Sequence, residues 1–235
     1  YENAEKSILC LSGFISAIGR VMLPKVSRMT RLKQFAAVQR HIRLSMELVM
    51  CMVCAMAFGL AAVAVNFAPL FYGDDFAYSG TLMIPLAFTL LSIGFANVIR
   101  TQWVLPQGRD TIFVHSVLTG AIINLIANFV LIPPFGAMGA AAATVLAEFS
   151  VPAVQFVYLR KELPYVQYLK TTGVYCLFGL VMAGVVALLG RVLPLHGWGK
   201  LAVQVIGGAA VYGALCLTYW KLAKRSDIFR LMRRK

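Results

Sequence analysis

The sequence predicts an all-α, polytopic membrane protein with about seven transmembrane helices. Hydrophobic residues make up 60% of the 235 residues and charged residues only 13%, with a mean hydropathy of +0.78. A soluble domain is about 45–50% apolar and 25% charged. Apolar stretches of about 20 residues, the length that crosses a bilayer, also recur along the whole chain.

The expected spans cover about residues 1–23, 45–70, 81–105, 112–132, 137–159, 171–193 and 201–222. Short polar, basic or glycine- and proline-containing segments separate them, and such segments end helices. The spacing of basic residues after the first span predicts an amphipathic helix on the membrane surface. These residues are Lys25, Arg28, Arg31, Lys33, Arg40 and Arg43.

Basic residues alternate between loops. Six Lys and Arg residues follow the first span and three follow the fifth, whereas the loops after the second and fourth spans have none. Cytoplasmic loops are enriched in Lys and Arg, so the tail 223–235 is expected in the cytoplasm and the N-terminal end outside. The net charge of +13 therefore reflects membrane topology rather than nucleic-acid binding. Because the chain starts outside and without Met, we expect it to be the C-terminal part of a longer protein.

The stretch 121–148 predicts two helices folded back on each other. Asn124 and Asn128 lie four residues apart and so share one helix face. Pro133 to Gly136 form the expected hinge. Small residues follow, among them Gly139 and Thr144, and they let two helix backbones approach closely in lipid. The polar groups either stabilise the packing of the two helices or form part of a functional site.

Motifs of catalytic or cofactor-binding sites are absent from the sequence. It contains no Walker, dinucleotide-binding, zinc-protease or nucleophile-elbow pattern, and no cofactor is expected. Cys51 and Cys54 form a C-x-x-C motif inside an apolar span without a second ligand pair. Neither metal binding nor redox activity is expected there.

Four stretches carry a family resemblance. They are GRVMLPKVSR at 19–28, FAPLFYGDDF at 67–76, QWVLPQGRD at 102–110 and INLIANFVLIPPFGAMGAAAATVLAE at 123–148. Together they resemble the C-terminal half of the polysaccharide-transport (Wzx-type) oligosaccharide flippases. These belong to the multidrug/oligosaccharidyl-lipid/polysaccharide exporter superfamily. The lipid II flippases, which share this helix order, are more distantly similar.

This resemblance implies a two-lobed fold of about fourteen helices around a central cavity. Residues 1–160 then correspond to family helices eight to twelve, in the C-lobe, and residues 161–222 to two additional helices. The implied activity moves a polyprenyl-pyrophosphate-linked oligosaccharide across the cytoplasmic membrane by alternating access. The implied partners are this substrate, membrane lipids, the missing N-terminal half, and a polysaccharide polymerase and glycosyltransferases.

Five residues are candidates for substrate binding. Glu5 and Lys6 stand where the lipid II flippases have an acidic-basic pair that faces the cavity, although Lys6 replaces the usual arginine. The alternative is a solvated helix end. Arg20 and Arg100 either line the inward mouth or snorkel to lipid headgroups. Gln102 begins the stretch that ends in LPQGRD, where we expect a structural turn or gate rather than direct substrate contact.

The resemblance also suggests coupling sites. Asn124, Asn128, the backbone carbonyl of Ala140 and Thr144 match positions that hold sodium in some lipid II flippases. Oxygen ligands suit such a hard cation, but Asn128 stands where a carboxylate would supply charge. Proton coupling through Glu148 is the alternative.

The sequence leaves three alternative functions open: a lipid II or teichoic-type flippase, a cation-drug antiporter, and a non-transporting scaffold for polysaccharide assembly enzymes. The basic candidate residues disfavour the antiporter, because cationic drugs require buried carboxylates. A membrane enzyme such as a glycan ligase is disfavoured because every loop is short.

Overall fold

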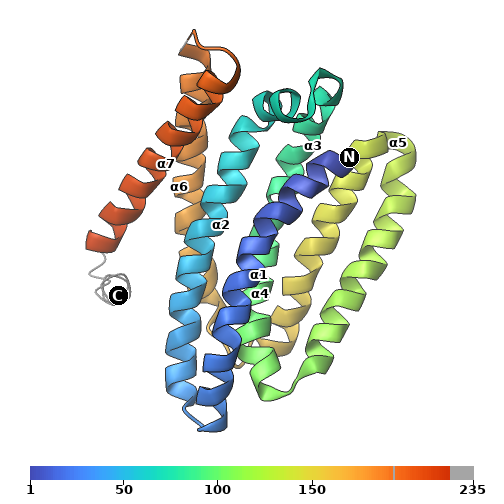
Figure 1. The fold of residues 1–235 in the computed structure, drawn as a ribbon. Coiled ribbons are helices and arrows are strands. Elements are labelled where there is room, and N and C mark those ends of the chain that lie inside the picture. Colours follow the sequence, from blue (N-terminus) through green and yellow to red (C-terminus); the bar gives the residue numbers. More distant parts are fainter. Residues whose placement is uncertain (193, 223–235) are drawn as a thin grey trace.

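The computed structural model describes residues 1–192 and 194–222, which form a bundle of long helices (Figure 1). The expected tail 223–235 lies outside these residues. No strand occurs in the described part, which confirms the all-α prediction. The long helices are α1 (Glu2–Arg31), α2 (Phe35–Tyr72), α3 (Ala77–Ala87), α4 (Thr89–Ile99), α5 (Asp110–Leu159), α6 (Tyr165–Val192) and α7 (Gly197–Leu222). Short helical turns are η1 (Asp74–Phe76), the π-helix η2 (Arg100–Val104) and the 3-10 helix η3 (Leu105–Gln107).

Six segments of the described chain are long and apolar enough to cross a membrane. They are α1, α2, the continuous stretch Asp74–Gln107, α5, α6 and α7. α5 has 50 residues and folds back at Gly136, so it makes two passes. The seven predicted passes are therefore present, two of them as limbs of α5.

Successive connections lie at alternate ends of the bundle. Figure 1 shows the α1–α2 turn and the turn before α5 at its lower end, and the α2–α3 connection and the tip of α5 at its upper end. The lower turns contain the basic stretch around Lys33 and the LPQGRD segment, whereas the upper connection contains Asp74 and Asp75. The basic α1–α2 turn and the acidic α2–α3 connection thus lie at opposite ends of the bundle, as the loop pattern predicts.

The basic stretch after the first span is not a separate surface helix, contrary to the expectation. α1 continues through Pro24 to Arg31, and α2 begins at Phe35. The reason is an apolar face on this stretch: Val26, Val38 and Ile42 are buried. Packing of these side chains extends the α1–α2 hairpin beyond the span that hydropathy alone defines.

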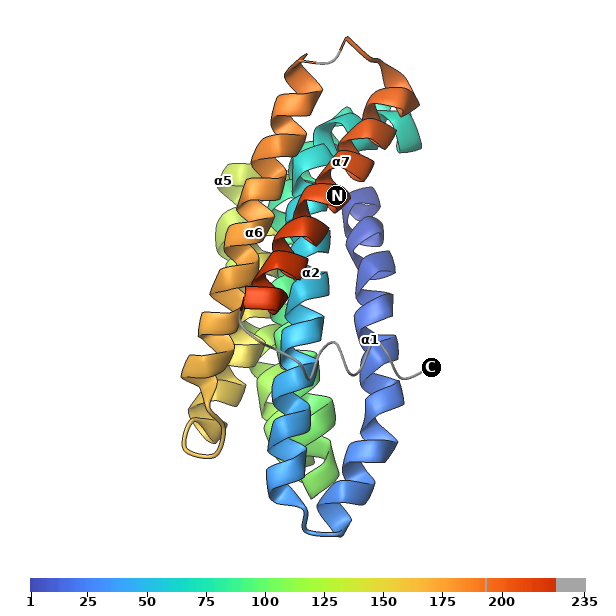
Figure 2. The same ribbon diagram turned by 90° about the vertical axis from the view of Figure 1, so that its left-hand side faces the viewer.

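The core forms around α2, which packs against α1, α3, α4, α6 and α7. Figure 2 shows α1 and α6 on opposite sides of α2. The approach of α6 is close at Gly179, where a Cβ would collide with the ring of Phe58. α6 and α7 are therefore an integral part of the packed bundle.

The tip of α5 bears out the predicted hinge. Gly136 adopts φ +56° and ψ −131°, a conformation that strongly favours glycine. Three residues later, a Cβ at Gly139 would collide with the backbone of Leu131. Close contact between the limbs thus depends on the small residues, and it brings polar groups of both limbs to one level.

Candidate functional site

A cavity of about 480 Å³ lies between α1, α4, η2 and both limbs of α5. Hairpin closure at Gly136 places the second limb opposite the first, and α4 closes a third side. The lining is partly polar at membrane depth, where polar groups are functional candidates. Its residues are Ser16, Ile93, Ala96, Asn97, Arg100, Phe113, Val117, Gly120, Ala121, Asn124, Thr144, Ala147, Glu148, Val151 and Gln155.

Arg100 supplies positive charge to this cavity. It starts the π-helical turn η2, an irregularity found frequently at functional sites. The guanidinium carbon lies 5.0 Å from the ring centroid of Phe113, a cation–π geometry. Its Nε is buried and has no hydrogen-bond partner among the described residues. The side chain of Arg100 therefore contacts the Phe113 ring while one of its hydrogen-bond donors has no partner in the described part of the chain.

Glu148 faces the same cavity from the second limb of α5. The hydroxyl of Ser92 on α4 donates a hydrogen bond to its backbone carbonyl, which ties the limb to α4 at this level. No ion pair between Glu148 and Arg100 is formed in the described part of the chain. The cavity therefore holds an acid and a base that are not neutralised by each other.

Two amides in the lining were not among the predicted site residues. Asn97 is 7% exposed, and its side chain occupies the space that Gly19 leaves on α1. Gln155 is 1% exposed, and its Oε1 has no hydrogen-bond partner in the part of the chain described. A usable signal was present, because Gln155 is the only polar residue between Pro152 and Tyr158.

The other substrate-binding candidates lie outside the cavity lining. Lys6 is exposed and pairs with Glu2, with 2.8 Å between Nζ and Oε1, rather than with Glu5. Arg20 is exposed on α1. Gln102 is buried, and neither polar atom of its amide has a partner within the described residues. The structure thus brings Arg100 to the cavity, and the roles of the other four stay predictions.

The proposed sodium ligands do not form a ready coordination shell. Asn124 and Thr144 line the cavity, whereas Asn128 and Ala140 do not. Asn128 donates a hydrogen bond to Oδ1 of Asn124 at 2.9 Å, and the Thr144 hydroxyl bonds with that of Tyr1 at 2.8 Å. Asn124 Oδ1 and the Thr144 hydroxyl thus each have one protein partner, and the assignment of these residues to sodium stays a prediction.

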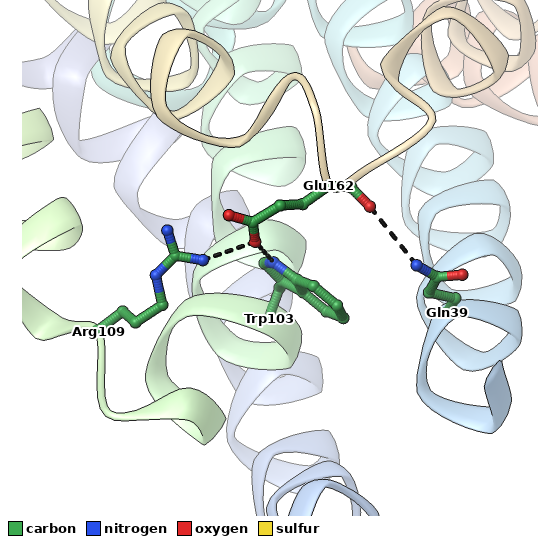
Figure 3. A network of polar contacts seen from close by, with 4 residues as sticks. All are labelled: Gln39, Trp103, Arg109 and Glu162. Atoms are coloured by element: carbon green, nitrogen blue, oxygen red, sulfur yellow. Dashed lines mark hydrogen bonds and ion pairs between the residues drawn. The ribbon is translucent and has the colours of Figure 1, made fainter. Parts of the chain in front are cut away.

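A second polar cluster fixes the lower end of the bundle. Glu162, in the α5–α6 connection, accepts hydrogen bonds at Oε2 from Arg109 (2.6 Å) and from the Trp103 indole (2.9 Å). Gln39 at the start of α2 donates a hydrogen bond to the backbone carbonyl of Glu162 at 3.5 Å (Figure 3). Partial burial opposes ionisation of Glu162, but the bonds from Arg109 and Trp103 outweigh it and lower the pKa of this carboxyl. The cluster agrees with the structural role expected for the LPQGRD turn.

Comparison with known proteins identifies the family. The family model described as lipid II flippase MurJ matches residues 4–207. The chain belongs to this family. The solved structure of lipid II flippase MurJ in an inward closed conformation aligns with a TM-score of 0.78, at 17% identity, over 93% of this chain and 46% of that one. The MurJ-like fold is therefore shared.

Two curated relatives of this MurJ-family chain are named for glycan transport. The probable low-salt glycan biosynthesis flippase Agl15 of Haloferax volcanii is 23% identical over 93% of this chain and 46% of its own length. The putative O-antigen transporter of Shigella dysenteriae is 22% identical over 63% of this chain and 36% of its own length. The chain spans less than half the length of the curated relatives it matches. Flippases are transporters, so the family is one of transport rather than of catalysis.

Proposed function

We propose that this chain forms part of a flippase that moves polyprenyl-pyrophosphate-linked oligosaccharide repeat units across the cytoplasmic membrane. The observation that carries the proposal is the incompletely bonded Arg100 in a membrane-depth cavity of a MurJ-family fold. A pyrophosphate headgroup needs such a cation, and arginine offers several donors to phosphate oxygens. The names of the two curated relatives favour a glycan cargo over lipid II.

In this proposal the cavity residues bind the headgroup while the lipid tail stays in the bilayer. Arg100 attracts the anionic group, and the amides of Asn97, Asn124 and Gln155 offer hydrogen bonds to sugar hydroxyls. Glu148 is the group that takes up or releases a proton. The basic turns face the cytoplasm, where they also interact with anionic lipids.

The first test is complementation in two hosts. One host lacks its repeat-unit flippase, and the other is depleted of its lipid II flippase. The complete reading frame that contains this chain is expected to restore surface glycan in the first host and not growth in the second. Growth of the second host alone would instead assign lipid II as the cargo.

Variants of Arg100 test the site within the same assay. Arg100→Gln is expected to abolish export, and Arg100→Lys to retain part of it because the charge is kept without the planar fork. Arg191→Gln is the matched control, since Arg191 is an exposed arginine at the end of α6. Normal export by Arg100→Gln at equal protein level would remove this residue from the substrate site.

A further inference from the structure

Four cysteines of the bundle lie in two interhelical pairs. The sulfur atoms of Cys51 on α2 and Cys216 on α7 are 3.6 Å apart, and those of Cys54 on α2 and Cys176 on α6 are 3.7 Å apart. Cys51 and Cys54 are three positions apart, so they lie on one side of α2. The two thiols of the C-x-x-C motif thus lie against two different helices, α7 and α6.

Each pair is positioned by a contact one helical turn away. Phe58, four residues after Cys54, packs on Gly179, three residues after Cys176. The Tyr212 hydroxyl, four residues before Cys216, donates a hydrogen bond of 2.7 Å to the backbone carbonyl of Cys51. These contacts hold α6 and α7 in register with α2 at the level of the sulfur atoms.

A polar chain ties the same three helices on the other side of the thiols. The Trp220 indole donates to the Tyr175 hydroxyl at 2.9 Å, and this hydroxyl donates to Oε1 of Glu47 at 3.2 Å. Glu47 precedes Cys51 by four residues, and Trp220 follows Cys216 by four. With anchors above and below, the two thiol pairs have little freedom to separate.

The arrangement suits disulfide formation rather than metal binding. Within the described residues, no group of three or more His, Cys, Asp or Glu side chains is placed to hold a metal ion. A disulfide requires the sulfur atoms to approach to about 2.05 Å. The sulfur atoms stand at 3.6 and 3.7 Å, so each pair needs to close by about 1.6 Å to reach this length.

We propose that Cys51–Cys216 and Cys54–Cys176 are two modification sites, at which a lipid-soluble two-electron oxidant converts each thiol pair to a disulfide. In the reaction with an azo compound such as diamide, both S–H bonds of a pair break and one S–S bond forms. The two hydrogen atoms, with their electrons, pass to the N=N bond and give a hydrazine. Oxidation covalently joins α2 to both α6 and α7, and a reducing thiol reverses it.

The test uses membranes that contain the complete protein. After diamide treatment, free thiols are blocked with N-ethylmaleimide, and cysteine peptides are mapped by mass spectrometry without reduction. We expect linked peptides for Cys51–Cys216 and for Cys54–Cys176, whereas exposed Cys10 is alkylated. The oxidised protein should also show a higher midpoint of thermal unfolding (Tm), which returns to its starting value after reduction.

Two matched variants make the result decisive. Cys176→Ser is expected to lose the Cys54 link and keep Cys51–Cys216, and Cys216→Ser is expected to do the reverse. The link that remains in each variant also shows that the bundle is folded. A Cys51–Cys54 link, links to Cys10, or complete alkylation of all five cysteines would overturn the proposal.

Discussion

Arg100 and Glu148 place two ionisable groups in one cavity at membrane depth. An uncompensated charge at this depth costs about 2.5–3.5 kcal/mol on insertion scales. Neither residue is neutralised by the other, and the hydrogen bond that reaches Glu148 from Ser92 goes to its backbone. In the function proposed above, this carboxyl binds a proton in one stage of the transport cycle and loses it in another.

Glu148→Gln is expected to reduce export by roughly tenfold or more, equivalent to about 1.4 kcal/mol in the barrier. The amide keeps the shape of the side chain but cannot exchange a proton. Surface glycan would be measured in sodium-free medium, with the proton gradient intact or collapsed. Glu148→Asp is the control and should retain export. If Glu148→Gln exports normally and collapse of the gradient still blocks transport, the proton acts elsewhere.

At the lower end, Glu162 makes stability depend on pH. Its folded-state pKa is lowered, so its contribution to stability is complete above the unfolded value of about 4.3 and is lost as the pH falls through the lower folded value. Because Glu162 and Arg109 are both about one-third exposed, the ion pair should contribute about 0.2–1 kcal/mol.

The Tm of the purified protein would be recorded from neutral pH down to about pH 3, below the ordinary Glu pKa. Glu162→Gln should lower the Tm at neutral pH and remove part of its fall in acid. Asp75→Asn changes the same charge at the other end of the bundle and should preserve that fall. Parallel curves for the wild type and Glu162→Gln would show that this cluster is not the acid-sensitive contact.

At the scale of elements, the α5 hairpin decides whether the cavity exists. Its limbs supply most of the lining, and their approach depends on Gly139 opposite the backbone of Leu131. Backbone atoms cannot move aside as a flexible side chain can. A side chain at this position must therefore push the limbs apart and displace Asn124 from Thr144 and Glu148.

Gly139→Val is expected to destabilise the protein by about 3 kcal/mol, at the upper end of overpacking effects. It should also abolish export. Gly184→Val is the matched control, because a Cβ at Gly184 meets nothing within 4 Å. Thermal unfolding and surface glycan would be measured for both variants. Equal Tm values would mean that the hairpin tolerates a wider separation than the structure indicates.

Hydropathy predicted the elements well where a helix lies entirely in lipid, and less well beyond it. The seven passes and the hinge at Gly136 follow from apolar length and from residues that break helices. The extension of α1 to Arg31 does not, because it depends on Val26 and Val38 packing across the α1–α2 turn. For the site, spacing gave the shared face of Asn124 and Asn128, and the family resemblance gave Thr144. Gln155 was not among the predicted site residues, and the fold places it in the same cavity lining as Arg100.

At the scale of the whole molecule, this chain represents less than half the length of its relatives. α1 exposes large apolar side chains, including Leu9, Phe14 and Val21, together with Arg20. In a two-lobed transporter, alternating access requires one lobe to move against another around a shared site. In the function proposed above, this chain provides the lobe that holds the cavity, and closing that cavity alternately toward the two sides of the membrane requires a second lobe.

The chain expressed alone is therefore expected to insert into the membrane without exporting glycan. A longer version, the complete reading frame that contains this chain, should restore export, as should co-expression of the remaining part of that frame as a separate polypeptide. Surface glycan would be stained in the host that lacks its repeat-unit flippase, and membrane insertion verified by extraction. Glu148→Gln in the longer version is the inactive control. Export by the isolated chain would contradict this expectation. Cross-linking in the same cells would then show whether two associated copies of the chain provide the two access states.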